Sequence, residues 1–204
     1  MSRANSSGTP GAAKRAMRAC DSSACSGSAC QVDSITLSPC FSVVQISSAV
    51  KLSTGAQRVY VMEGNEVLLA TPCSVGTASS PTPHDTFTIY SKTANRRRVS
   101  SPGAGYPMTF WMEFKSAYGM HWGFVKPYPC THGCVRLPIA SAQKIFSMVK
   151  VGTPLIIAPS HPEDATIGKT LPVLDDSTLP DPPESYMQSP KVFEDAARGK
   201  LYTF

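Results

Sequence analysis

The chain has 204 residues, of which 42% are hydrophobic and 16% charged, and its formal net charge at pH 7 is +5. This length and apolar fraction predict one folded core of ordinary size and exclude a wholly disordered chain. No stretch is long and apolar enough to span a membrane. No apolar run of signal-peptide length follows the first basic residues.

The charge is unevenly distributed along the chain. Residues 159–204 hold eight acidic and four basic residues, a net charge of −4, which leaves +9 for residues 1–158. A basic body is compatible with an anionic polymer such as a cell wall and equally with a nucleic acid. The run of Arg96, Arg97 and Arg98 is most simply a solvated loop, and aromatic residues do not alternate with basic ones. We therefore expect no nucleic-acid partner.

The two ends differ in composition from the middle. Residues 1–40 are rich in Ser, Ala and Gly and poor in large apolar residues, so we expect them to be disordered. Residues 159–204 contain seven prolines and many acidic residues, which predicts an extended tail with one short helix at residues 192–197. The folded domain is therefore expected at residues 41–158.

The first half of this domain predicts short strands. Residues 41–46 form a short apolar run, and residues 57–62 and 66–70 flank a glycine-containing turn, as in a hairpin. Residues 86–90 and 108–114 alternate in polarity with the period of a strand. These patterns predict a mainly β structure.

One helix is predicted in the second half. Residues 139–149 place their apolar side chains on one helical face, and the pattern ends before Gly152. Residues 154–158 are a candidate for a buried strand. The sequence therefore predicts a mainly β, mixed-strand domain with one main helix.

Two histidines near one cysteine are the residues that indicate chemistry. Thr131, His132, Gly133 and Cys134 are consecutive, and His121 lies thirteen residues before Cys134. A thiol is a useful nucleophile only as the thiolate, so it requires a base or a positive environment. Gly133 permits a sharp turn before the sulfur, and a helix beginning near Pro138 would place Cys134 close to a positive helix end. The pattern predicts a nucleophilic Cys134 with His121 as its base.

These residues resemble the signature of the L,D-transpeptidase (YkuD-type) catalytic domain, in which a histidine precedes an [S/T]HGC motif. An apolar residue and Arg136 follow the motif here, as in that family. Residues 58–65 resemble the family's first hairpin, residues 81–87 its next strand entry, and residues 107–112 the strand before the histidine. Asp85 stands where the family usually has glycine. The resemblance covers residues 41–158 in family order.

The resemblance implies a compact β-sandwich-like domain of mixed strands with a packed helix, and it implies an acyltransferase. In this reaction Cys134 attacks a carbonyl of a peptidoglycan stem peptide and forms a thioester. An amine of a neighbouring stem then attacks the thioester and gives a 3→3 cross-link or an anchor to the wall. Water as the acceptor would make the protein an L,D-carboxypeptidase. Carbapenems are expected to acylate the same cysteine.

The resemblance also implies the protein's setting. No metal or organic cofactor is required, and the partners are donor and acceptor stem peptides. The expected location is the cell envelope or periplasm, although no signal peptide is visible in the sequence. The sequence indicates nothing about the oligomeric state.

Further site residues are expected around the pair of Cys134 and His121. The N–H groups of Gly133 and Cys134 are candidates for oxyanion stabilisation, and the Trp122 carbonyl is a candidate to orient His121. The residues expected to bind the oxyanion or the substrate are His132, Gly133, Arg136, Trp122, Tyr118 and Met120. His84 and His161 are expected to have no catalytic role.

Other readings of the same cluster remain open. Cys130, His132 and Cys134 together with His121 supply four zinc-type ligands, although their spacing is tight for one tetrahedral ion. An inactive wall-binding module is another alternative. Cys130 is also a candidate redox partner, because a reversible disulfide with Cys134 would block the nucleophile.

Overall fold

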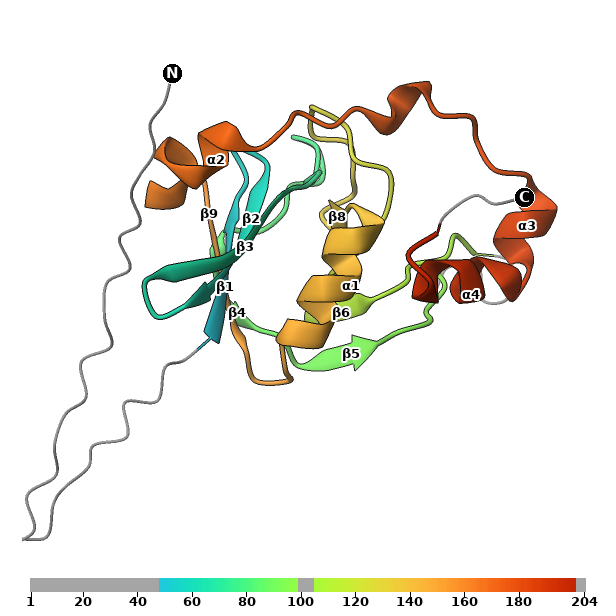
Figure 1. Ribbon diagram of the computed structural model, residues 1–204, viewed down its shortest axis with the longest axis horizontal. Coiled ribbons are helices and arrows are strands. Elements are labelled where there is room, and N and C mark those ends of the chain that lie inside the picture. The colour runs from blue at the N-terminus through green and yellow to red at the C-terminus, as the bar shows by residue number, and fades with distance from the viewer. Residues whose placement is uncertain (1–47, 99–104, 201–204) are drawn as a thin grey trace, which may run out of the picture. The chain divides into compact units, whose positions relative to one another are not determined.

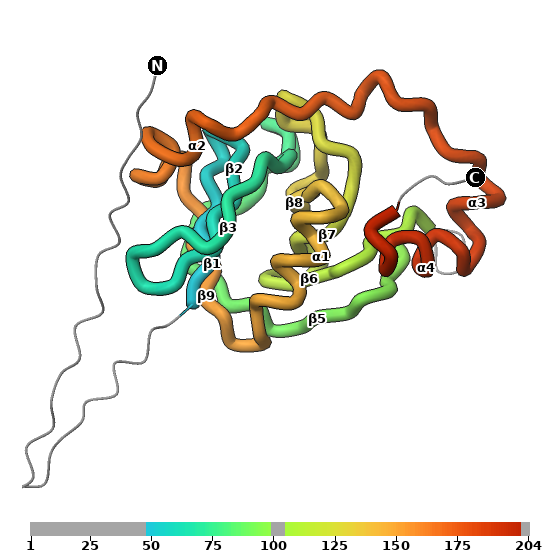
Figure 2. The backbone as a smooth tube through the Cα atoms, viewed as in Figure 1, coloured from blue at the N-terminus to red at the C-terminus, as the bar shows by residue number. Residues whose placement is uncertain are grey.

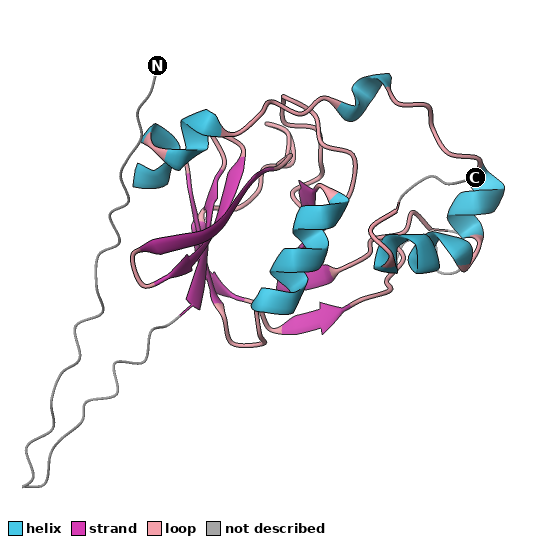
Figure 3. Cartoon of the chain, viewed as in Figure 1, coloured by secondary structure: helices cyan, strands magenta, loops and turns pink. Residues whose placement is uncertain are grey.

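A computed structural model describes residues 48–98 and 105–200 of the chain, and these residues form two mixed β-sheets and several short helices (Figures 1 and 3). The mainly β fold class expected from the sequence is confirmed. The predicted disorder of residues 1–40 and the predicted strand at residues 41–46 lie outside the described residues.

The first sheet has five strands in the order β3-β2-β1-β9-β4. Its strands are β1 (Ser48–Ser53), β2 (Arg58–Glu63), β3 (Glu66–Pro72), β4 (Asp85–Thr88) and β9 (Pro154–Ala158). β1 and β9 run parallel, and the other neighbours run antiparallel. The hairpin predicted from the sequence is β2–β3, in which Glu63 pairs with Glu66 across the turn. Gly64 has a φ of 58° in this turn, a conformation that glycine adopts without steric cost.

The second sheet has four strands in the order β5-β6-β7-β8. Its strands are β5 (Ser91–Thr93), β6 (Trp111–Lys115), β7 (Tyr118–Trp122) and β8 (Val135–Leu137). β5, β6 and β7 pair antiparallel, whereas β7 and β8 pair parallel. The chain therefore makes a connection between β7 and β8, and this connection carries the Thr131–Cys134 motif.

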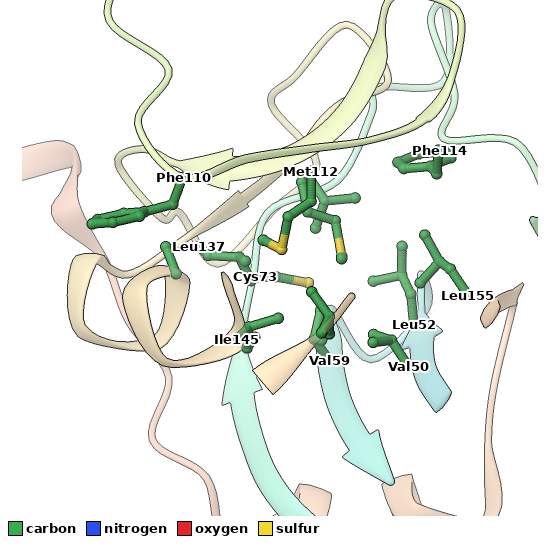
Figure 4. Close-up of a cluster of buried hydrophobic side chains, with 14 of the residues drawn as sticks. Val50, Leu52, Val59, Cys73, Phe110, Met112, Phe114, Leu137, Ile145 and Leu155 are labelled. Atoms are coloured by element: carbon green, nitrogen blue, oxygen red, sulfur yellow. The ribbon is translucent and has the colours of Figure 1, made fainter. Parts of the chain in front are cut away.

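The core lies between the two sheets because alternate residues of each strand face the partner sheet. Figure 4 shows side chains of both sheets, among them Leu52, Leu155 and Met112, pointing toward one another. Helix α1 (Ile139–Met148) adds Ala142 and Ile145 to this cluster, as its apolar periodicity predicts. One face of each sheet is thus used for the core, and the opposite face is left for other contacts.

Part of the outer face of the first sheet is covered by the chain that follows β9. This chain forms the 3₁₀ helix η1 (Pro162–Ala165) and the short helix α2 (Ile167–Thr170). Asp164 accepts hydrogen bonds from the hydroxyls of Ser53 and Tyr60, both at 2.7 Å. Burial raises the pKa of Asp164, but hydrogen bonds from the His161 N–H and these hydroxyls outweigh it and hold the pKa below its ordinary value.

Two further contacts complete this cover. Lys51 on β1 forms an ion pair with Glu163 at 2.6 Å. Gly168 lies so close to β2 that a Cβ atom there would come within 2.3 Å of the Tyr60 hydroxyl. A glycine at this position therefore lets the cover approach the sheet closely.

The C-terminal segment continues across the domain and ends in a pair of helices (Figure 2). Its elements are the 3₁₀ helix η2 (Asp176–Thr178), α3 (Glu184–Gln188) and α4 (Lys191–Ala197). The helix predicted at residues 192–197 is confirmed as α4. The expectation of an otherwise extended tail is wrong, because residues of this segment pack on the domain. Asp176 exchanges two hydrogen bonds with the backbone of Val125, both at 2.8 Å.

Candidate functional site

The parallel pairing of β7 and β8 brings the two expected key residues together. His121 pairs with Arg136, and Met120 pairs with Val135. Successive side chains of a strand point to opposite faces, so His121 and Arg136 share the outer face while Met120 and Val135 enter the core. Cys134 immediately precedes β8, two positions before Arg136, and so lies at the same outer face of the sheet.

The turn before the thiol is built by Thr131 and Gly133. Gly133 has a φ of 102°, which other residues rarely adopt, and an added Cβ would come within 2.3 Å of the Tyr118 ring. The Thr131 hydroxyl donates to the Cys134 carbonyl at 2.6 Å and accepts the Gly133 N–H at 3.1 Å. The Thr82 hydroxyl donates to the Gly133 carbonyl at 3.1 Å. These hydrogen bonds hold the turn and thereby place the Cys134 backbone.

His121 is buried, and its ring is held on two sides. Its Nδ1 lies 2.5 Å from the Trp122 carbonyl oxygen, the group that the sequence suggested as a candidate to orient it. Because a carbonyl only accepts, the proton belongs on Nδ1 and Nε2 is free to accept one. The Trp111 ring stacks on the imidazole with centroids 5.6 Å apart. Burial lowers the pKa of His121 to about 4, so the ring is neutral at neutral pH.

The thiol of Cys134 is also neutral in the resting protein. Its sulfur donates to the Ala117 carbonyl at 3.7 Å. Burial raises the pKa of the thiol, whereas the Gly119 N–H and the charges of Arg136 and Arg96 lower it by less. The expectation of a thiol acidified by a helix end is wrong, because β8 separates Cys134 from α1, which begins at Ile139. The arrangement therefore requires a base to take the thiol proton.

Both residues line one cleft of about 440 Å³. The cleft is lined by Arg96, Arg98, Tyr106, Met108, Trp111, Ala117, His121, Thr131, His132, Cys134 and Arg136. Its walls come from the segment between β5 and β6, from β7, and from the turn before β8. The basic side chains at this site make it suitable for an anionic group, and carboxylates pair well with arginine.

The sequence suggested that the three consecutive arginines form a solvated loop, and this expectation is wrong. Arg96 pairs with Glu113 at 2.9 Å and lies over the Trp111 ring. Arg97 donates to the carbonyls of Met187, Gln188 and Ser189 at the end of α3. Arg98 lines the cleft. Each arginine has a different environment because the tertiary structure surrounds this short segment on several sides.

Arg136 separates the cleft from a second cavity of about 210 Å³. Tyr106 and Arg136 line both spaces, and the C-terminal residues 176, 177, 179, 181 and 182 form the far wall of the second one. The C-terminal segment thus contributes to the surroundings of the cleft. The sequence alone had treated it as a separate tail.

The remaining expected residues are placed as follows. His132 is exposed and lines the cleft, and Tyr118 packs beside Gly133. Met120 and Trp122 point into the core, on the face of β7 opposite to His121, and do not form the wall expected of them. The period of two residues along a strand explains the difference, because neighbours of His121 must face the other way.

The sequence did not identify Trp111 and Glu113 as part of this site. The indole N–H of Trp111 donates to Glu113 at 3.2 Å, and both lie on β6 with alternation that points them outward. The signal available in the sequence was a charged residue between apolar neighbours in the strand.

Among residues 48–98 and 105–200, no group of three or more His, Cys, Asp or Glu side chains is arranged to hold a metal ion. No helix in the same residues is long and apolar enough to cross a membrane.

The two mixed sheets and the thiol-bearing cleft define a mainly β domain of one known class. The sequence model of the YkuD family, described as the L,D-transpeptidase catalytic domain, matches residues 47–157. This match covers more than half of the chain, and the protein therefore belongs to the YkuD family of L,D-transpeptidases. The family consists of enzymes that act on peptidoglycan peptides and are generally associated with the cell wall.

Two solved structures with TM-scores above 0.5 agree with this chain in fold. An L,D-transpeptidase from Stackebrandtia nassauensis is 20% identical, with a TM-score of 0.51 over 58% of this chain and 58% of that one. One from Xylanimonas cellulosilytica is 20% identical, with a TM-score of 0.51 over 55% and 60% of the two chains. One from Mycobacterium smegmatis is 24% identical, with a TM-score of 0.49 over 55% and 58%. The matched region thus spans about three fifths of these solved chains. No curated protein matched the sequence.

Proposed function

We propose that the protein is a cysteine-dependent L,D-transpeptidase whose nucleophile is Cys134 and whose base is His121, within a catalytic domain at residues 41–158. The observation that carries this proposal is the parallel register of β7 and β8. It brings a neutral imidazole and a thiol to the same face of one sheet, where both line the same cleft. A nucleophile and base in one cleft are what covalent acyl transfer requires.

The first half of the reaction forms a thioester. The Cys134 sulfur attacks the carbonyl carbon of the donor peptide, and its proton passes to Nε2 of His121. The tetrahedral intermediate then collapses, the C–N bond to the terminal D-residue breaks, and the imidazolium returns the proton to the leaving amine. A base with a pKa of about 4 is uncharged before the attack, so it is ready to accept a proton at neutral pH.

The second half releases the product. An acceptor amine attacks the thioester, gives its proton to His121, and forms a new amide while the C–S bond breaks. The thiolate then recovers the proton from the imidazolium. Water in place of the amine gives a carboxylic acid by the same steps, which is the hydrolase alternative.

The Cys134 N–H is the oxyanion donor that we propose. The Gly133 N–H, also expected in this role, already donates to the Thr131 hydroxyl. One well-placed donor lowers the barrier by about 3 kcal/mol. The backbone of Cys134 is held by the same hydroxyl through its carbonyl, which supports a fixed direction for this N–H.

The substrates that we propose are peptidoglycan stem peptides, as both donor and acceptor. Arg98, Arg136 and His132 line the cleft beside the thiol and suit the carboxylates of such peptides. We place the protein in the cell envelope for the same reason. The proposed chemistry uses protein groups alone.

Cys130 is proposed as a redox partner of Cys134. Its sulfur lies 4.0 Å from Arg136 Nη1, whose side chain also lines the cleft. A disulfide between the two cysteines would stop acyl transfer until a thiol reduces it. Cys130→Ser should then make activity insensitive to a mild oxidant, and unchanged sensitivity would disprove this role.

The deciding experiment is intact-mass measurement after incubation with imipenem, the carbapenem found in a solved L,D-transpeptidase complex. Wild type should gain one covalent adduct, and Cys134→Ala should gain none. Analysis of muropeptide products then distinguishes an amine acceptor from water. Absence of an adduct under reducing conditions, with one zinc bound per chain, would replace this proposal with a metal-binding role.

A further inference from the structure

Glu113 lies beneath the cleft and joins two elements of the site. It is on the outer face of β6, its side chain is 13% exposed, and it is not one of the residues that line the cleft. One carboxylate oxygen accepts hydrogen bonds from Arg96 at 2.9 Å and from the Trp111 indole at 3.2 Å. The other accepts from the Ala117 backbone N–H at 3.3 Å.

The first of these contacts leads to His121. Trp111 is 1% exposed and stacks on the imidazole, with the two rings inclined by 30°. The Cζ atom of the Arg96 guanidinium lies over the indole, 4.3 Å from the centroid of the Trp111 ring. A Cβ at Gly119 would come within 2.7 Å of the same ring, so the indole fills the space above β7. The ring that supports the imidazole is thus held in place by the Glu113 and Arg96 pair.

The second contact leads to Cys134. Ala117 has a φ of 63°, a left-handed conformation that L-residues other than Asn and Asp rarely adopt. Its carbonyl accepts from the Cys134 thiol, and its N–H donates to Glu113. The carboxylate therefore stabilises the strained turn on which the thiol rests. Such strain is commonly found at functional sites.

Three charged side chains act on the thiol, two of them basic and one acidic. The charged groups that act on Cys134 are Arg136 from β8, Arg96 from the segment after β5, and Glu113 from β6. Burial raises the pKa of Glu113, but hydrogen bonds from Trp111 and Arg96 outweigh it and hold the pKa below its ordinary value. The carboxylate is therefore ionised at neutral pH. Loss of its charge would leave Arg96 uncompensated and make the thiol more acidic.

We propose that Glu113 is a positioning residue for the acyl transfer, which holds the indole against His121 and the turn against Cys134. This inference rests on the proposed function for its chemistry, but its geometry involves residues outside the expected motif. The competing explanation is that the pair of Glu113 and Arg96 only stabilises the fold. The cover of the first sheet offers a matched control in Glu163 of η1, which is 12% exposed and pairs with Lys51 of β1 at 2.6 Å.

The test compares wild type, Glu113→Gln, Trp111→Phe, the double variant and Glu163→Gln. Two rates are measured by site-resolved mass spectrometry at Cys134 between pH 5 and pH 9, one with imipenem and one with iodoacetamide. Glu113→Gln should slow imipenem acylation at pH 7 by about 10- to 100-fold, because small misplacements have effects of this size. The pH dependence of the iodoacetamide rate of Glu113→Gln should move to lower pH, because the thiol becomes more acidic. Glu163→Gln should leave both rates within about twofold, as expected of a site remote from the cleft.

The double variant tests whether Glu113 acts through Trp111. A shared mechanism predicts that the double variant is about as slow as the slower single variant, whereas independent effects multiply. Trp111→Phe keeps a ring on His121 and removes the indole N–H, so it serves as the test where Glu113→Gln does not fold. A Glu113→Gln protein with the rates and pH profile of Glu163→Gln, changed only in melting temperature, would overturn the inference.

Failure of the proposed function would look different. In that case wild type itself forms no imipenem adduct at Cys134. The iodoacetamide profile still reports the environment of the thiol, because only the thiolate reacts. A shift of that profile in Glu113→Gln but not in Glu163→Gln would then show that Glu113 acts on the thiol, while the absence of an adduct would overturn its role in acyl transfer.

Discussion

The two sheets of this protein use their inner faces alike and their outer faces differently. Both inner faces build one core, with Leu52 and Leu155 from the first sheet and Leu137 and Met112 from the second. The outer face of the first sheet is partly covered by η1 and α2, and under this cover the hydroxyls of Ser53 and Tyr60 reach Asp164. The outer face of the second sheet opens into the cleft that contains Cys134.

The difference shows how the same kind of residue acquires a structural or a chemical environment. Glu113 and Glu163 are both partly buried carboxylates that pair with a basic residue. Glu163 belongs to the cover itself and pairs with Lys51 of β1, whereas Glu113 lies on β6 and supports residues that line a cleft. His161 and His121 differ in the same way. The two faces therefore share residue types, and the cleft on the outer face of the second sheet separates their environments.

The largest expected effect comes from the two histidines. His121→Gln removes the proposed base and should slow imipenem acylation by about 10² to 10⁴, the usual contribution of such a group. His161→Gln changes a ring whose Nε2 lies 3.2 Å from the Leu52 carbonyl and 3.3 Å from that of Ile156. It should leave the acylation rate unchanged and lower the free energy of unfolding by about 1 kcal/mol.

Both variants are measured by the rate of adduct formation and by urea unfolding. Equal acylation rates for the two variants would show that the open outer face has no special role for its histidine. A large loss of stability in His121→Gln, with normal acylation of the folded fraction, would assign His121 to the fold.

The next effect distinguishes the two inner faces. Leu137 and Leu155 are both 0% exposed and belong to the same core. Truncation of either to Ala should lower the free energy of unfolding by about 2–5 kcal/mol. Leu137→Ala should also slow acylation per folded molecule, since Leu137 lies on the strand that begins after Cys134. Urea unfolding and adduct formation at matched folded fractions check this, and equal acylation in both variants would contradict it.

The smallest effect concerns pH. Burial lowers the pKa of His121 to about 4, so the neutral base persists as the pH falls until that value is reached. Wild-type imipenem acylation should therefore hold its His121-dependent part down to about pH 4 and then fall about tenfold per pH unit. His121→Gln should lack this limb. Adduct formation from pH 3 to pH 8, with circular dichroism as the control for folding, measures it. A fall centred near the ordinary histidine pKa of about 6.5 would instead indicate a solvated imidazole.

Local sequence patterns were sufficient for several elements. The β2–β3 hairpin follows from strand residues around Gly64, and α1 follows from the spacing of its apolar residues. Strand β9 was predicted with its observed bounds. The motif of His121 and Cys134, with the hairpin upstream, was sufficient to indicate the family. In each of these cases the determining interactions join residues that are close in the sequence.

Long-range packing decided the rest. β1, β5, β7 and β8 were not predicted. β1 carries polar residues that are buried only under η1, and β5 and β8 are three residues long. β7 is buried on both faces and lacks the alternation of a half-exposed strand. The three consecutive arginines are alike as residues, and the positions of Glu113 and α3 give Arg96 and Arg97 their different partners.

For the thiol, too, the sequence determined one part of the chemistry and the tertiary structure the other. The sequence by itself determined that a histidine and a cysteine of a known motif are present. The tertiary structure decided that burial raises the pKa of Cys134 and lowers that of His121. Burial depends on which distant segments cover a side chain, and no short pattern of residues contains that information.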